Sequence, residues 1–463
     1  MFTTGNLFVV GAIVRLSHFL SDESSMTEIF SYKFVRSIDA NRTVKDAFIT
    51  AMTASRPRTR ISVTDLVNPM QAFYKRVHPE VQPSIDRQQI MMAGTGFHDI
   101  FGKLVSTEEY LEQLLEMDGI VGKVDIFEDV PVELKTTSSI PTDIYAGRTS
   151  YFEQLAMYCV MAGNDTGRLI IYQKHAENRS PEIKVFEVEF NNLHKVAVEM
   201  KSRSENFKLA LERKTPIGLM KCEWLHRGCD YSRICPCRDV QPSEPMLARE
   251  DVVITAKPEM ESDLKNILSV PIVVDTNIKL KDLVLPRKFA KYRKPISENG
   301  PGNDSLRPMQ DIERQGFRFA LQNALESGSS GDFTAQPISL PPLEDKVNLH
   351  RGIPTVLRTS LFREMVDRDR LVSTFPHYFD RLAFECALAN IRQGRLILYY
   401  EKIPRDKFMV YDLTFHSRDL IVQEAARRIE LLEQGAEQKE LPNCPSWMAK
   451  YCEFGSSCQC GEQ

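Results

Sequence analysis

An internal repeat constrains the fold of this chain more than any other feature. Residues 151–172 read YFEQLAMYCVMAGNDTGRLIIY, and residues 378–399 read YFDRLAFECALANIRQGRLILY, with no gap between the two. A second pair of segments, 123–137 and 346–360, reads KVDIFEDVPVELKTT and KVNLHRGIPTVLRTS. Because self-similarity at a long period marks a duplicated structural unit, the chain is expected to hold two similar domains.

The repeat places the two domains at 28–243 and 247–463, a size that agrees with the roughly 100–200 residues of a typical domain. Residues 1–27 match neither half and are expected to form an N-terminal extension. Two alternatives stay open for it: a native extension, or a stretch that precedes a natural start at Met26. No apolar run reaches the ~18 residues of a membrane span, and no basic segment precedes Leu7 as it would in a secretory signal. These patterns favour a cytoplasmic protein without a membrane partner.

The composition is that of an ordinary globular protein. Apolar residues make up 42% of the chain and charged residues 26%, with 59 Lys and Arg against 63 Asp and Glu. The net charge of −4 argues against binding nucleic acid by bulk charge but allows a local basic groove. β-rich runs alternate with segments of helical spacing, which predicts an α/β fold.

Eight of the ten cysteines fall in two clusters of nearly equal spacing, C-x6-C-x5-C-x-C and C-x7-C-x5-C-x-C. Local clusters of four in a chain of this size are more typical of metal ligands than of disulfides. By ligand count, four thiolates suit a 4Fe-4S cluster and a tetrahedral Zn²⁺ ion equally. The expected ligands are Cys222, Cys229, Cys235 and Cys237 in the first cluster and Cys444, Cys452, Cys458 and Cys460 in the second. Cys159 and Cys386 lie in apolar helical segments and are expected to be buried core thiols.

A group of polar residues in the first half has the spacing of a site. Glu133 and Lys135 alternate with apolar residues, so they share one face of a predicted strand. Asp125 lies in the preceding predicted strand. A two-residue turn between the strands would place Asp125 on the opposite face from Glu133, so the connection should hold an odd number of residues or a bulge, pairing 125 with 133. A charged residue on a strand commonly lies only at a solvent-exposed edge. Glu133 therefore indicates a site only together with the other polar residues that follow the same order along the chain.

That ordered set resembles the RecB-like branch of the PD-(D/E)XK nucleases. The matching residues, in chain order, are His98 in a predicted helix, Asp125 in a strand, Glu133-x-Lys135 in the next strand, and Gln154-x-x-x-Tyr158 in a helix. The cysteine cluster that follows looks like that of the CRISPR-associated RecB-like exonucleases and of the nuclease subunits of bacterial recombination helicases. Those proteins carry one further cysteine upstream, in a Cys-Pro pair. Here the matching positions read Asn68-Pro69 and Leu285-Pro286, so four local cysteines would complete each site.

The resemblance implies two tandem restriction-endonuclease-like domains, each a mixed sheet flanked by helices and closed by a four-cysteine metal site. It implies a metal-dependent DNA nuclease, expected to be a single-strand exonuclease, in DNA repair or recombination or in CRISPR adaptation. Mg²⁺ or Mn²⁺ would be held by His98, Asp125 and Glu133, with Lys135 as a further catalytic residue, while Gln154 and Tyr158 would position the substrate. At the cysteines the resemblance favours iron–sulfur over zinc.

The second half lacks this set and is expected to be inactive. The repeat aligns His98, Asp125, Glu133, Lys135, Gln154 and Tyr158 with Arg318, Asn348, Val356, Arg358, Arg381 and Glu385. No two carboxylates remain there to bind a divalent cation. The three arginines leave two alternatives: they grip a DNA phosphate, or they pair with Glu385 in a purely structural core.

Two rival functions remain. The chain could be a metal-stapled scaffold that binds DNA or a helicase without cutting, or a zinc-ribbon regulatory protein. The expected partners are single-stranded DNA ends, with a helicase or CRISPR integration proteins as further candidates. The chain has no phosphate-binding GxxxxGK[ST] loop, so any unwinding would come from another protein.

Overall fold

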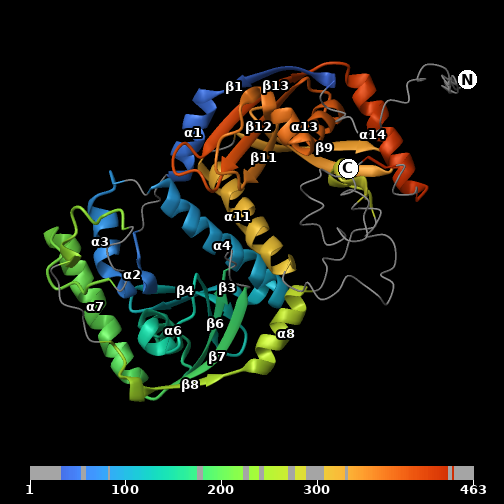
Figure 1. Ribbon diagram of the computed structural model, residues 1–463. Coiled ribbons are helices and arrows are strands. Elements are labelled where there is room, and N and C mark those ends of the chain that lie inside the picture. Colours follow the sequence, from blue (N-terminus) through green and yellow to red (C-terminus); the bar gives the residue numbers. More distant parts are fainter. Residues whose placement is uncertain are drawn as a thin grey trace, which may run out of the picture.

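The computed structural model describes residues 33–53, 59–81, 84–174, 181–222, 229–238, 245–269, 277–287, 307–328, 332–435 and 441–442. They form two mixed sheets, each flanked by helices (Figure 1). The predicted α/β class is confirmed at this level. Within these residues, no helix combines the length and apolar character that crossing a bilayer requires.

The first sheet has the strand order β2-β4-β5-β6-β7-β8, with β3 also paired to β4. Pairs β2/β4 and β5/β6 are parallel, and the other pairs are antiparallel. The strands are β2 (Ile61–Ser62), β3 (Leu111–Met117), β4 (Ile120–Phe127), β5 (Pro131–Thr137), β6 (Thr166–Gln173), β7 (Glu182–Phe190) and β8 (Val252–Ala256).

The second sheet repeats this plan in the order β1-β13-β12-β11-β10-β9. Pair β11/β12 is parallel, as its counterpart β5/β6 is, and the remaining pairs are antiparallel. The strands are β1 (Val35–Ala40), β9 (Phe333–Leu340), β10 (Leu343–His350), β11 (Ile353–Ser360), β12 (Gln393–Tyr400) and β13 (Phe408–Phe415).

The two sheets exchange their edge strands. Strand β1 comes from the start of the chain but pairs with β13 of the second sheet, with Asp39 opposite Asp412. Strand β8 follows the first cysteine cluster but pairs with β7 of the first sheet, with Val252 opposite Phe190. The halves 28–243 and 247–463 therefore describe the sequence repeat, whereas each finished sheet uses one strand from the other half.

Helices cover both faces of each sheet. Those in the first half of the chain are α1 (Arg42–Thr53), α2 (Val63–Val67), α3 (Pro69–Val77), α4 (Ile85–Val105), α5 (Ile144–Gly147), α6 (Thr149–Ala162) and α7 (Leu193–Arg213). Those in the second half are α8 (Pro258–Ser269), α9 (Leu280–Val284), α11 (Arg307–Gly328), α12 (Leu371–Thr374), α13 (Pro376–Leu388) and α14 (Arg418–Glu433).

Helices α4 and α11 cross between the two sheets and join them (Figure 1). The crossing is made at two glycines: a Cβ atom on Gly96 would lie 1.8 Å from the carbonyl oxygen of Gly316. Each helix also contributes to both cores. Met92 of α4 packs in a cluster with Phe317 and residues of the second sheet, whereas Ile312 of α11 packs in a cluster with Phe97 and residues of the first. The two halves are therefore one packed body at this crossing.

A buried arginine ties together three helices of the first half. Arg203 of α7 donates from Nη1 to Glu153 of α6, at 2.9 Å, and to the Leu66 carbonyl of α2, at 3.3 Å. Its Nε donates to Glu199, at 2.9 Å. A buried guanidinium needs such partners, because an unpaired charge in the interior is strongly destabilising.

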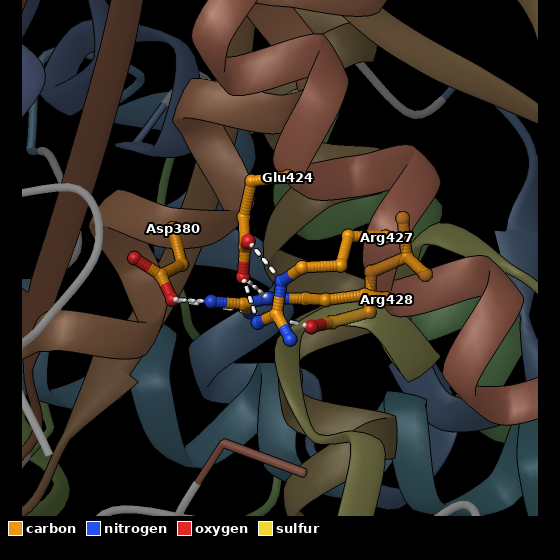
Figure 2. Close-up of polar contacts among 5 residues, drawn as sticks. Asp380, Glu424, Arg427 and Arg428 are labelled. Carbon is orange, nitrogen blue, oxygen red and sulfur yellow. Dashed lines mark hydrogen bonds and ion pairs between the residues drawn. The ribbon is translucent and has the colours of Figure 1, made fainter. Parts of the chain in front are cut away.

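The second half repeats this bridge at equivalent positions (Figure 2). Arg428 of α14 donates to the Leu283 carbonyl of α9, at 2.7 Å, and to Asp380 of α13, at 3.4 Å. Its Nε donates to Glu424, at 2.8 Å, and the same carboxylate accepts from the more exposed Arg427. The bridge is a structural element that both halves share.

The two isolated cysteines also occupy equivalent places. Cys159 and Cys386 are both buried, which confirms the prediction of core thiols. Each sulfur lies against a glycine of the neighbouring strand: a Cβ on Gly167 or Gly394 would come within 2.8 Å of it. Glycine is required at these strand positions because the thiol fills the space that a side chain would need.

Candidate functional site

The β4–β5 hairpin brings the two predicted carboxylates to one face. Three residues, 128–130, connect the strands, and Ile126 lies opposite Val132. This register places position 125 opposite position 133, as the alternation of the sequence requires. The odd-length connection that was expected is present.

Asp125 is held by contacts from two other elements. Its Oδ2 accepts a hydrogen bond from the Leu134 N–H of β5, at 2.8 Å. Its Oδ1 lies 3.4 Å from Nδ1 of His98, which comes from α4. Burial alone would raise the pKa of Asp125, but the His98 imidazole, Lys135 and the Leu134 N–H together hold it below its ordinary value.

Glu133 is the most unusual acid of the site. Only 3% of the residue is exposed, one carboxylate oxygen pairs with Lys135, and the other, Oε2, is buried without a hydrogen-bond partner. Burial raises the pKa of Glu133 to about 7, with Asp125 adding to the rise and Lys135 opposing it. An orphaned carboxylate oxygen is costly in a folded protein and marks a site built for something other than stability.

Lys135 links the carboxylates to helix α6. Its Nζ donates to Oε1 of Gln154, at 2.8 Å, and Nε2 of Gln154 donates to the Tyr158 hydroxyl, at 3.0 Å. The spacing of i and i+4 puts Gln154 and Tyr158 on one helix face, as the sequence predicted. Burial alone would lower the pKa of Lys135, but Glu133 and Asp125 raise it, so the amine carries its charge.

Two contributions were not predicted from the sequence. Lys135 Nζ lies 5.3 Å from the ring centre of Tyr151, a cation–π contact from the same helix face. Gly122 of β4 lies beneath Tyr158, where a Cβ would come within 2.9 Å of the ring. The spacing i, i+3 between Tyr151 and Gln154 was the available signal for the first. No sequence signal identified the role of the second.

The structure thus brings all six predicted residues of the first half into one connected group, drawn from α4, β4, β5 and α6. Within the described residues, no three His, Cys, Asp or Glu side chains converge in an arrangement ready for a metal ion. Asp125 and Glu133 instead face His98 and Lys135.

The first cysteine cluster is described in part, and a four-cysteine metal site is not shown. Cys222 and Cys237 are buried, whereas Cys229 and Cys235 are half-buried. The sulfur of Cys222 accepts a hydrogen bond from the Gln71 N–H of α3, at 3.3 Å. Burial raises the pKa of Cys222 to about 12, and the other three thiols add to the rise. The second cluster, Cys444, Cys452, Cys458 and Cys460, lies outside the described residues.

In the second half, the equivalent positions surround a cavity of about 120 Å³. All six residues that align with the first site line it: Arg318, Asn348, Val356, Arg358, Arg381 and Glu385. The sequence left open that these arginines pair with Glu385. Arg381 does so, because it forms an ion pair with that carboxylate. The same place in the two sheets is therefore acidic in one half and basic in the other.

Comparisons with known proteins identify no family for this chain. No protein-family model matches the chain, and no curated protein matches it. One solved structure, the crystal structure of SSO0001, is similar to 42% of this chain and 97% of its own, at 18% identity and with a TM-score of 0.29. A likeness at that TM-score carries no argument about function.

Proposed function

We propose that the first half is a metal-dependent DNA nuclease of the RecB-like PD-(D/E)XK type, acting as an exonuclease on single-stranded ends. The observation that carries the proposal is the convergence of Asp125, Glu133 and Lys135 on one face of the β4–β5 hairpin, with His98 and Gln154 facing them from two helices. A buried carboxylate with one unpartnered oxygen, close to a second carboxylate and a lysine, is a donor set that suits a hydrolytic cation site.

The residues present fit a divalent cation. Glu133 offers its unpartnered Oε2, Asp125 lies opposite in the hairpin, and His98 adds an imidazole nitrogen. Carboxylate oxygens suit Mg²⁺, and the imidazole also admits Mn²⁺. A cation held by these three residues would lower the pKa of an attacking water and stabilise charge on the scissile phosphate.

The chain's own residues supply the remaining functions. Lys135 carries a charged amine between Glu133 and Gln154, where it can hold a phosphate oxygen and orient the water that attacks phosphorus. Gln154 and Tyr158 fix the direction of that amine, since each donates or accepts in one continuous chain of hydrogen bonds. Gln154 is half-buried on α6 and can also contact the nucleic acid strand beside the hairpin, whereas the buried Tyr158 acts through Gln154.

In the same proposal, each cysteine cluster binds a metal centre that holds the end of its domain against the domain core. The Gln71 N–H contact places Cys222 beside the start of α3, next to Asn68-Pro69, where the resembling nucleases carry their upstream cysteine. A 4Fe-4S cluster is the proposed occupant, with Zn²⁺ as the alternative. Iron, sulfide and zinc analysis of protein purified without oxygen distinguishes the two. DNA repair, recombination or CRISPR adaptation is the proposed role.

The test is removal of the Glu133 carboxylate. Glu133→Ala and Glu133→Gln should each lower cleavage of a single-stranded oligonucleotide with Mg²⁺ or Mn²⁺ by on the order of 100- to 1,000-fold, because charge stabilisation in the transition state is lost. The control is Glu261→Gln. Glu261 is a buried carboxylate of α8 that accepts from the Val185 N–H, away from the hairpin, and its loss should leave cleavage unchanged.

Cleavage by Glu133→Ala at the wild-type rate would overturn the proposal. Wild-type protein that binds the oligonucleotide but cuts it with neither metal would favour the scaffold instead.

A further inference from the structure

We propose that the second half binds a phosphate group of a nucleic acid strand in the cavity that replaces the first half's acidic site. The cavity lies between α11, β10, β11 and α13, and its volume is about 120 Å³. Nothing in this inference requires the first half to cut DNA, because a non-cleaving scaffold could use the same pocket.

The charge of the lining is the first argument. Among the described residues that line the cavity, four are basic and one is acidic, a formal balance of +3. The basic residues are Arg318, Lys346, Arg358 and Arg381, and the acid is Glu385. The positions equivalent to the proposed cation site of the first half thus carry side chains that attract an anion.

Arg358 lines the pocket and forms no ion pair within bonding distance of a carboxylate among the described residues, although Glu385 attracts it from farther away. Its Nη1 donates to the Leu357 carbonyl, at 2.8 Å, and its guanidinium lies 5.6 Å from the ring centre of Tyr378. Burial, together with repulsion from Arg381 and Arg318, lowers the pKa of Arg358 to about 10, although Tyr378 and Glu385 oppose this. An arginine desolvated beside other arginines favours an anion in the pocket.

The structural alternative explains only part of this arrangement. Arg381 does pair with Glu385, but that ion pair does not include Arg358, which lies in the same lining. Oε2 of Glu385 is itself buried without a partner, so the carboxylate is not fully used by the pair. A lining repaired only for stability would have paired or removed Arg358.

A phosphate group fits the remaining requirements. A guanidinium presents several N–H donors in a planar fork that matches phosphate oxygens. The cavity, at about 120 Å³, has room for a phosphate group. His98 and Arg318 each lie two residues beyond the crossing glycine of their own helix, so both sites adjoin the α4–α11 crossing. One strand passing that crossing could contact both.

The test compares two double variants of equal charge change. Arg318→Gln with Arg358→Gln removes two pocket charges and leaves the Arg381–Glu385 pair intact. The matched control, Arg351→Gln with Arg368→Gln, removes two exposed arginines of the same half that do not line the cavity. Binding of a fluorescent single strand, with and without a 5′-phosphate, is measured by anisotropy at several salt concentrations in the presence of a chelator.

The pocket variant should bind the strand roughly tenfold more weakly than the control, and its slope of log affinity against log salt should fall by about 1. Weakening confined to the 5′-phosphorylated strand identifies a terminal phosphate, and equal weakening of both strands identifies a backbone phosphate. Either supports the proposal. Affinity and slope equal to those of the control would overturn it.

A second variant guards against a folding defect. Arg318→Gln alone changes an exposed side chain of α11, so the protein should keep its melting temperature. It should nevertheless weaken strand binding in the same direction as the double variant. Inorganic phosphate provides the last comparison: if phosphate raises the melting temperature of wild type but neither variant alters strand binding, the pocket holds only a free anion and the proposal fails.

Discussion

The two halves share a strand order but differ in what their equivalent polar residues do. The buried arginine bridge occurs in both, around Arg203 in one and Arg428 in the other. The acidic site does not: Glu133 in one half stands where Val356 stands in the other. Contacts that hold helices on a sheet must be kept for each half to fold. Polar residues that do not hold the fold together can differ between the halves. The comparison therefore distinguishes residues that both folds need from residues that only one half has.

The largest effect on stability should come from breaking the shared bridge. Arg203→Met and Arg428→Met each remove a buried cation that bridges helices and take it away from a buried carboxylate, Glu153 or Asp380, which should cost about 3–5 kcal/mol of unfolding free energy. Arg427→Met is the matched control. It removes the neighbouring, more exposed arginine from the same Glu424 and should cost under about 1 kcal/mol. Urea unfolding of the three variants measures the difference.

A large loss of unfolding free energy for one arginine variant and none for the other would show that the two bridges are not equivalent. The two halves would then not share this structural element.

A smaller effect is expected at the helix crossing. Gly96→Ala would put a Cβ against the Gly316 carbonyl, a backbone group that cannot rotate away, so the variant should lose about 3 kcal/mol. Gly94→Ala, on the same helix, would place its Cβ 3.6 Å from Thr136 Oγ1, an ordinary contact, and should be neutral or gain up to about 1 kcal/mol from helix propensity. Thermal unfolding distinguishes them. Equal stability of the two variants would contradict the close crossing.

The smallest effect is a pH dependence that His350 contributes in the second half. His350 of β10 is buried among Phe48, Phe333 and Arg395, where the first half has Phe127. Burial, together with the charges of Arg395 and Arg351, lowers the pKa of His350 from its ordinary 6.5 to about 4, while Asp332 and Asp412 oppose this. The unfolded chain therefore takes up a proton between pH 6.5 and 4 that the folded chain refuses, and stability should fall by about 2 kcal/mol as the pH drops through that window.

His350→Phe should reduce this dependence, because the side chain then matches Phe127 of the first half; His377, whose pKa burial and Arg358 lower to about 3, keeps its own share. Melting temperatures measured from pH 7 down to pH 5 check the result. A variant as sensitive to acid as wild type would assign the loss to other groups.

Much of the candidate site followed from local patterns. A site built on Asp125 and Glu133 required the register that the hairpin has, because a shift by one residue would have placed the two carboxylates on opposite faces of the sheet. The helical spacing of Gln154 and Tyr158 put both on one face. The contact between Lys135 and the Tyr151 ring did not follow, because it depends on how helix α6 packs across the sheet, and that is set by residues far apart in the chain.

By itself, the sequence determined the duplication, the α/β class, the hairpin register and the residues that differ between the halves. All of these follow from the internal repeat and from periodicities within single helices and strands. Only the tertiary structure decided which sheet receives β1 and which receives β8, and that α4 and α11 meet at Gly96 and Gly316. The physical reason is the duplication itself. Two sheets built on the same plan each offer an edge to an additional strand, so the pattern of a strand does not by itself say which sheet it joins, and the choice depends on the packing of the whole chain.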